Sequence, residues 1–183
     1  SLPVMHKKVI FSLSLVALLT ACQSMTAKPP LTAVAEMKPT TAAAGAQLAP
    51  AGRVKFTQLT NGKVLIEASI SGLKPNAEHG FHVHAVADCS GDGLKTGAHF
   101  NPDNHAHNHP AQANRHAGAL FNLKTNAQGV GVLRQEADTI TLTEGKYSVI
   151  GQPLITHRDP DDYVSQPLGN AGPRISCGII TKG

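Results

Sequence analysis

VKFTQLTNGKVLIEASI, at residues 54–70, consists of two alternating apolar and polar runs joined by Asn61-Gly62. An Asn-Gly pair between such runs is the strongest short-range signal for a β-hairpin. Successive side chains of a strand point to opposite faces, so alternate residues of the second run are expected to be buried together. These residues are Val64, Ile66, Ala68 and Ile70. The stretch therefore predicts paired strands over 54–60 and 64–70.

Further strand-like runs, separated by turn residues, predict an all-β chain. They lie at residues 79–84, 117–123, 129–134, 147–155 and 174–181. Many short strands with Gly and Pro between them favour an antiparallel, immunoglobulin-like sandwich or a flattened barrel. Residues 85–115 and 158–173 fit no strand, and structureless stretches of that length in a compact domain are usually functional.

Histidines concentrate around these two stretches. His82 and His84 lie two apart in Gly80-Phe81-His82-Val83-His84. On a strand both rings would therefore project from one face and could bind one metal ion. Such a pair also occurs by chance in strands and surface loops. Additional histidines at 99, 107, 116 and 157 favour metal binding.

Several separated motifs resemble the copper-zinc superoxide dismutases, including bacterial members. They are HFNP at 99–102, the spaced histidines that follow, DCS at 88–90, and GNAGPRISCG at 169–178. The resemblance runs from about residue 53 to the end. It implies an eight-stranded antiparallel Greek-key β-barrel with a metal-binding loop and an electrostatic loop, and an enzyme that converts superoxide to dioxygen and hydrogen peroxide.

The resemblance also implies the roles of individual histidines. Copper would be held by His82, His84, His99 and His157, and imidazole nitrogen suits copper(II). His99 would bridge copper to zinc and carry a proton during turnover. Zinc would be held by His99, His107 and His116.

The expected acidic zinc ligand, three residues after His116, is replaced by Ala119. A structural zinc site normally has four ligands. Three alternatives are open: weaker zinc with water completing the shell, a substitute ligand, or a copper-only enzyme. The substitute would come from Asp103, His105 or His109, although the two histidines could equally be solvated loop residues.

Four further residues belong to the expected site or its surroundings. By resemblance, Asp161 accepts hydrogen bonds from His82 and His107 and fixes both rings. Arg174 would attract and orient the anionic substrate, since its charge persists at any physiological pH. Cys89 and Cys177 are an even pair in an exported chain, which favours a disulfide over two free thiols, and the resemblance implies the same bond.

The N-terminal part predicts export. Residues 5–22 carry a basic start, an apolar run over 9–19 and a small-residue end, which together are typical of a secretory signal. LTAC at 19–22 resembles a bacterial lipoprotein cleavage box, so residues 1–22 are expected to form a lipoprotein signal with an N-terminal extension before Met5. Cleavage before Cys22 would leave this cysteine as the lipidated first residue. Gln23 then favours the outer membrane, with the protein facing the periplasm.

Residues 23–51 are rich in Ala, Thr, Pro and Lys, and predict a flexible tether before one domain at 52–183. The formal net charge of +4 falls to +2 once Lys7 and Lys8 are removed. Trp is absent and no basic run with interleaved aromatics occurs, so nucleic-acid binding has little support. Membrane contact is expected only through Cys22, and the chain could be a monomer or a homodimer.

Two functions from different classes are compatible with these residues. The first is a lipid-anchored copper superoxide dismutase in the cell envelope. The second is a non-catalytic copper or zinc storage or carrier lipoprotein that kept the barrel. The complete set of copper-side histidines together with Arg174 favours the enzyme.

Overall fold

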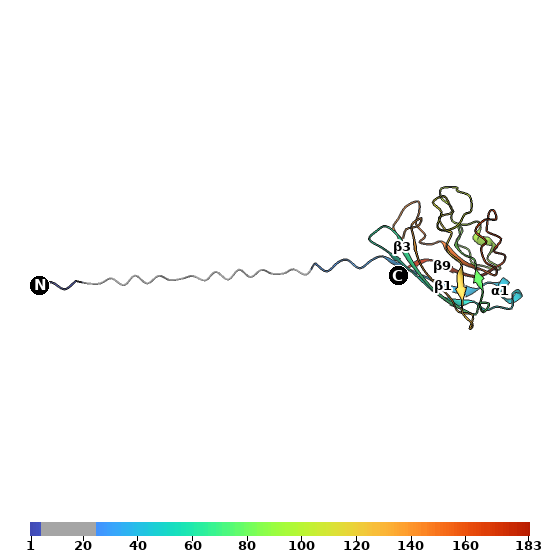
Figure 1. Ribbon diagram of the computed structural model, residues 1–183, viewed down its shortest axis with the longest axis horizontal. Coiled ribbons are helices and arrows are strands. Elements are labelled where there is room, and N and C mark those ends of the chain that lie inside the picture. Colours follow the sequence, from blue (N-terminus) through green and yellow to red (C-terminus); the bar gives the residue numbers. More distant parts are fainter. Residues whose placement is uncertain (5–24) are drawn as a thin grey trace.

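A computed structural model describes residues 1–4 and 25–183 (Figure 1). Its strands are β1 (Thr32–Pro39), β2 (Ala51–Gln58), β3 (Val64–Ser71), β4 (Glu78–His79), β5 (Phe81–Val83), β6 (Leu123–Thr125), β7 (Gly131–Ala137), β8 (Pro153–His157), β9 (Arg174–Ile179) and β10 (Thr181–Lys182). Two short helical turns accompany them, α1 (Thr41–Gly45) and the 3₁₀ turn η1 (Leu94–Thr96). No helix within 1–4 and 25–183 is long and apolar enough to cross a membrane.

The strands form one curved antiparallel sheet in the order β4-β6-β7-β3-β2-β1-β9-β8-β5, with β10 pairing to β1. Its two outer strands, β4 and β5, are separated in the chain by Gly80 alone, so the sheet curls into a nearly closed barrel. Neighbours far apart in sequence, such as β3 with β7 and β1 with β9, require long connections across the barrel ends. The predicted all-β antiparallel barrel is confirmed, and eight of its strands have three or more residues.

The hairpin predicted over 54–70 is present. Strands β2 and β3 pair from Ala51 opposite Ser71 to Gln58 opposite Val64, and Gly62 adopts the positive φ of 84° that the tight turn needs. Alternate residues of β3 are buried in the barrel as predicted: Val64, Ile66, Ala68 and Ile70. The hairpin therefore supplies one wall of the core.

The expected tether over 23–51 is wrong for its second half. Residues 32–39 form β1, which pairs with β2, β9 and β10, and α1 follows directly. Ala33, Ala35 and Met37 are at most 2% exposed. Their period of two is a strand pattern, but small alanines among Thr, Pro and Lys resemble a disordered composition. The folded part therefore begins near Thr32 rather than at residue 52.

Other expectations fall outside what the structure describes. Residues 5–24 hold the predicted signal and Cys22, and they lie outside the described residues. Two long loops, residues 84–122 and 158–173, contain the stretches 85–115 and 158–173 in which no strand was expected, and they hold only the turn η1 and isolated bridges. The strand expected over 117–123 is wrong except at its last residue, where β6 begins, and the strand expected over 147–155 forms only from Pro153. Both loops pass over the same part of the barrel, where the histidines gather.

Candidate metal centre

Strand pairing brings four histidines together at one end of the barrel. His82 is the middle residue of β5, and His84 follows its end. β5 pairs with β8, whose last residue is His157, and an isolated bridge places His99 opposite His84. One ring nitrogen from each of these four histidines lies within 4.8 Å of the others, and all four side chains are buried.

The outer nitrogens of three of these rings have hydrogen-bond acceptors. The imidazole N–H groups donate from His82 Nε2 to Asp161 Oδ2 (2.7 Å), from His84 Nδ1 to the Gly97 carbonyl (2.9 Å), and from His157 Nδ1 to the Gly172 carbonyl (2.9 Å). These acceptors set the tautomer, so each ring turns an unprotonated nitrogen inward. The group is thus an arrangement of lone pairs around a common point.

The inward nitrogens are the structural sign that a cation belongs there. Within the described part of the chain, no hydrogen-bond partner exists for the buried atoms His82 Nδ1, His84 Nε2, His99 Nε2 and His157 Nε2. Buried polar atoms without partners are rare in folded proteins, and four converging lone pairs of this kind are what a metal ion satisfies. All-imidazole nitrogen donation suits copper.

Burial keeps these histidines neutral and therefore able to bind metal. Desolvation, with a smaller contribution from the neighbouring His82, lowers the pKa of His157 to about 3. Desolvation likewise lowers the pKa of His82 and takes that of His84 well below its usual value, with smaller contributions from neighbouring cations such as Arg174. A neutral imidazole is the form that donates to a metal.

A second group shares His99. One ring nitrogen each from His99, His107 and His116 lies within 4.8 Å of the others, and all three residues are buried. His99 Nδ1 faces His116 Nδ1 at 2.9 Å, while His107 Nδ1 is buried with no partner among the described residues. His99 thus presents Nε2 to the first group and Nδ1 to the second. Three convergent imidazoles fit a zinc ion, which takes His nitrogen readily.

Among the described residues, the second group has no fourth protein donor. Ala119 lies beside it, 1% exposed, with its N–H donated to the His116 carbonyl at 3.1 Å, and its methyl group cannot coordinate. None of the expected substitutes joins the group in the described chain. Asp103 instead pairs with Lys146 at 2.7 Å, His105 Nδ1 bonds the Arg115 carbonyl at 3.2 Å, and the His109 ring packs against Tyr163 with centroids 4.6 Å apart.

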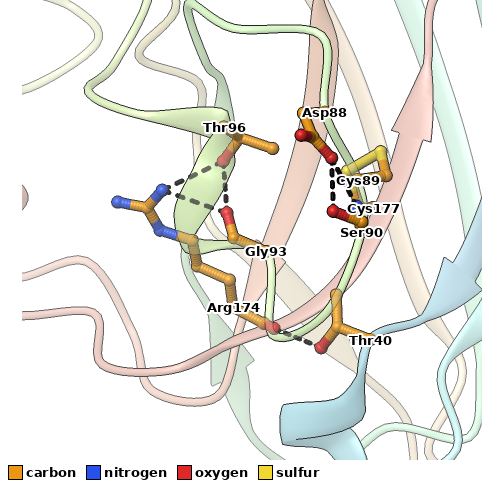
Figure 2. The surroundings of a disulfide bond; sticks show 8 residues. All are labelled: Thr40, Asp88, Cys89, Ser90, Gly93, Thr96, Arg174 and Cys177. Atoms are coloured by element: carbon orange, nitrogen blue, oxygen red, sulfur yellow. Dashed lines mark hydrogen bonds between the residues drawn. A yellow bond between two sulfur atoms is a disulfide. The ribbon is translucent and has the colours of Figure 1, made fainter.

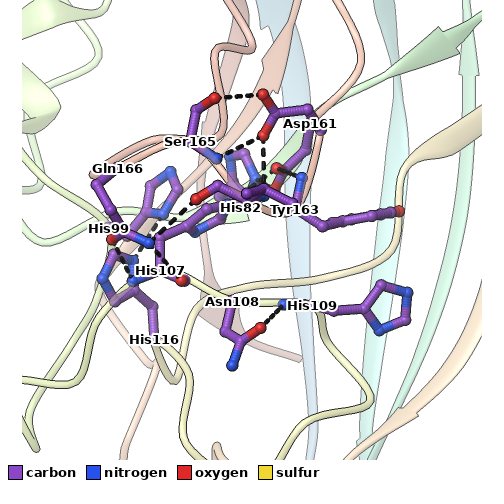
Figure 3. A network of polar contacts seen from close by, with 12 residues as sticks. His82, His99, His107, Asn108, His109, His116, Asp161, Tyr163, Ser165 and Gln166 are labelled. Carbon is purple, nitrogen blue, oxygen red and sulfur yellow. Dashed lines mark hydrogen bonds and ion pairs between the residues drawn. The ribbon is translucent and has the colours of Figure 1, made fainter.

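Asp161 connects the two groups, as the sequence predicted. Its Oδ2 accepts from His82 Nε2 at 2.7 Å and its Oδ1 accepts from His107 Nε2 at 2.9 Å (Figure 3). Burial opposes ionisation of this carboxyl, but the donors on His107 and His82 outweigh it and hold its pKa well below its usual range. The carboxylate therefore fixes one ring from each group.

Two residues that sequence reasoning missed hold Asp161 in turn. The Asn122 side-chain amide pairs with the Asp161 main chain, at 3.0 Å to its carbonyl and 2.9 Å from its N–H. The Tyr163 N–H donates to Asp161 Oδ1 at 2.7 Å, and the Asn122 N–H donates to the Tyr163 hydroxyl at 2.9 Å. Only the contacts themselves reveal these roles, because Asn and Tyr carry no metal-binding signal in the sequence.

Arg174 is the first residue of β9 and is anchored beside the centre. It is 7% exposed, and its Nη1 donates to Thr96 Oγ1 at 2.9 Å and to the Gly93 carbonyl at 3.2 Å (Figure 2). Its positive charge contributes to the lowered pKa of the copper-side histidines. One nitrogen of the guanidinium is thereby fixed, and Figure 2 shows the other end of the group pointing away from these contacts.

The predicted disulfide is present between Cys89 and Cys177. It joins the loop after His84 to β9, three residues beyond Arg174. The loop so attached carries Gly93 and Thr96, which bond the guanidinium. The disulfide therefore ties the loop that holds the guanidinium to β9, the strand that carries Arg174 itself.

Known proteins match this chain in sequence and in fold. The family model "copper/zinc superoxide dismutase" matches residues 50–180. Superoxide dismutase (Cu-Zn) 2 of Brassica juncea is 41% identical over 135 residues, which is 70% of this chain and 88% of that protein.

Two solved structures have a similar fold. One is the clock protein EA4, with a TM-score of 0.73 and 36% identity, covering 84% of this chain and 96% of that one. The other is a double mutant of a SOD-like protein from Bacillus subtilis, with a TM-score of 0.71 and 30% identity, covering 81% and 96%.

Proposed function

Because this chain belongs to the copper/zinc superoxide dismutase family, we propose that it disproportionates superoxide at a centre built from its own histidines. Copper would be held by the four inward nitrogens of His82, His84, His99 and His157. The single observation that carries this assignment is that all four atoms are buried without a partner in the described chain. Every donor comes from one chain, so a second copy is not required.

Copper bound there supplies reversible one-electron chemistry, through which one superoxide is oxidised to dioxygen and a second, with two protons, is reduced to hydrogen peroxide. The protein's part is to bind, orient and protonate. Arg174 attracts the anion and orients it, with its guanidinium held by Thr96 and Gly93. Asp161 keeps the His82 ring in its productive tautomer.

His99 is the residue suited to carry a proton. Its Nε2 faces the copper side and its Nδ1 faces His116. A ring held through Nδ1 can accept a proton at Nε2 and later give it to the substrate, without leaving its place. This assigns His99 both a ligand role and an acid–base role.

We propose that zinc binds the second group through His99, His107 and His116 but is held less tightly than four protein ligands would hold it. Ala119 supports this, since it stands where a carboxylate would complete the shell. Asp103, His105 and His109 are occupied elsewhere, so water is the better candidate for the fourth position.

We also propose that the protein works in the bacterial cell envelope, anchored to the outer membrane by lipid at Cys22. The support is the sequence pattern of residues 5–22, together with the disulfide, which suits an oxidising compartment. With β1 beginning at Thr32, nine residues would separate the lipid from the barrel.

The substrate role of Arg174 gives a direct test. Arg174→Gln in the copper-loaded protein should lower kcat/KM for superoxide by about tenfold or more and flatten its dependence on ionic strength, because the attracting charge is lost. Copper content should stay unchanged, since Arg174 donates no lone pair to the group. Pulse radiolysis at several salt concentrations measures both effects.

Arg134→Gln provides the matched control, because this arginine lies on β7 with a 71% exposed side chain. It removes the same charge away from the centre and should leave the salt dependence nearly intact. Equal kinetics for Arg174→Gln and the parent would refute the substrate role. A copper-loaded parent with no dismutase activity would instead favour metal storage or transport.

A further inference from the structure

Of the three zinc-side histidines, only His107 is hydrogen-bonded by the second long loop at both its ring and its main chain. Its ring Nε2 donates to Asp161 Oδ1 at 2.9 Å. Its main-chain N–H donates to Gln166 Oε1 at 2.8 Å, and its carbonyl accepts from Gln166 Nε2 at 2.7 Å. Both partners come from the loop 158–173, so this loop fixes His107 at two points.

The side-chain amide of Gln166 pairs with the main chain of His107 through one accepted and one donated hydrogen bond, as two peptide groups do. Donor and acceptor are both satisfied by a single residue, 59 positions away in the chain, and Nε2 also reaches the Val164 carbonyl at 3.2 Å. Figure 3 shows this amide reaching His107 beside His99 and His116. Much of Gln166 faces solvent, so the two hydrogen bonds, rather than packing, are its main attachment there.

The same loop packs closely on the His107 ring. Gly169 has a positive φ of 69°, and a Cβ there would collide with Asp161 Oδ1 and approach His107 Nε2. Only glycine permits this approach. The loop is therefore fitted to His107 rather than resting near it.

A site with three protein donors depends more on how well those donors are held in place. His107 lies in an irregular stretch of the loop 84–122. In addition, Ala119 supplies no fourth donor that would help to fix the metal. Holding a ligand in its binding geometry before the metal arrives reduces the ordering cost of binding.

We propose that Gln166 is a positioning residue for zinc: its amide holds the His107 main chain so that Nδ1 points at the nitrogens of His99 and His116. The inference rests on the proposed zinc binding at this group. It concerns zinc alone, because none of the four copper-side rings bonds to Gln166 in the described chain.

Gln166→Met tests this role, since methionine keeps the length of the side chain but can neither donate nor accept these bonds. In the full chain, the zinc dissociation constant, measured by competition with a chromophoric chelator, should rise about tenfold, within the range for outer partners of metal ligands. Copper affinity should change less than twofold. Cobalt(II) bound in place of zinc should show altered visible bands, which report the geometry of the three nitrogens.

Gln128→Met is the matched control, because Gln128 is exposed in the turn between β6 and β7. It should leave zinc affinity, copper affinity and the cobalt spectrum at parental values. Gln166→Ala provides a second variant should the longer apolar side chain disturb folding, and the melting temperature of each metal-free variant checks this.

Several results would overturn the inference: zinc affinity within twofold of the parent, an equal loss of zinc and copper affinity, or a parent that takes up no zinc. Dismutase activity of the copper-loaded parent separates this question from the proposed function. An active parent with unchanged zinc binding in Gln166→Met refutes only the positioning role. An inactive copper-loaded parent refutes the proposed function, whatever Gln166 does.

Discussion

At the scale of single residues, the zinc-side group is governed by one missing carboxylate. Ala119 is buried, its N–H bonds the His116 carbonyl, and it occupies the position where the resemblance implies an acidic zinc ligand. Ala119→Asp should therefore tighten zinc binding by at least about tenfold, because a fourth protein ligand completes the tetrahedral shell. Chelator competition on the parent and the variant measures the change.

The same substitution should have the opposite effect on the metal-free protein. A buried carboxylate without a partner is costly, so the free energy of unfolding should fall by about 1–3 kcal/mol. Ala127→Asp is the control, since Ala127 is exposed in a turn. Equal zinc affinity in parent and Ala119→Asp would show that residue 119 is not directed at the metal.

At this scale, the grouping of the copper-side histidines could be predicted from the sequence. Histidines at 82, 84, 99 and 157 were expected to converge, and the structure brings them together. The contacts of Asn122, Tyr163 and Gln166 were not predictable, because amide and hydroxyl side chains bond to whatever backbone the fold places beside them. Such partners are set by tertiary geometry and not by a local pattern.

At the scale of secondary structure, β1 decides where the folded domain begins. Met37 is 2% exposed on β1, in a segment that the sequence suggested was a tether. If β1 is an integral strand, Met37→Ala should lower the free energy of unfolding by about 2–5 kcal/mol, the range for emptying a core position. Urea denaturation of the metal-free protein measures this.

Lys38→Ala is the matched control in the same strand, because Lys38 is exposed and its loss should change stability by no more than about 0.5 kcal/mol. Unfolding at the same urea concentration for Met37→Ala and the parent would mean that residues 32–39 contribute little to stability.

The hairpin over 54–70 was predictable because its turn residues and its alternation of apolar and polar residues both indicate paired strands. β1 was not, since its pairing with β9 joins residues far apart in the chain.

At the scale of the whole molecule, the buried histidines make the metal-free fold sensitive to acid. Burial lowers the pKa of His157 to about 3 and that of His116 to about 4, from 6.5 in an unfolded chain. Between pH 6.5 and these values the unfolded chain binds more protons than the folded one, so stability is full above pH 6.5 and falls as the pH drops.

The urea midpoint of the metal-free protein should accordingly be clearly lower at about pH 4.5 than at about pH 7.5. His157→Gln should reduce this slope, because it removes one of the groups that must be protonated on unfolding. Below about pH 4 the lowered pKa of Asp161 adds a further loss in the same direction. A midpoint that is flat across this range would contradict the account of neutral, inward-facing rings.

We propose that one chain holds copper tightly through four imidazoles and zinc more weakly through three, and that the result is a dismutase. Elemental analysis of copper and zinc per chain, with superoxide disproportionation measured on the same sample, tests it most directly. After full metal loading and extensive dialysis, we expect one copper per chain, less than one zinc, and retained activity. Bound copper without activity, or a chain that retains no copper, would contradict it.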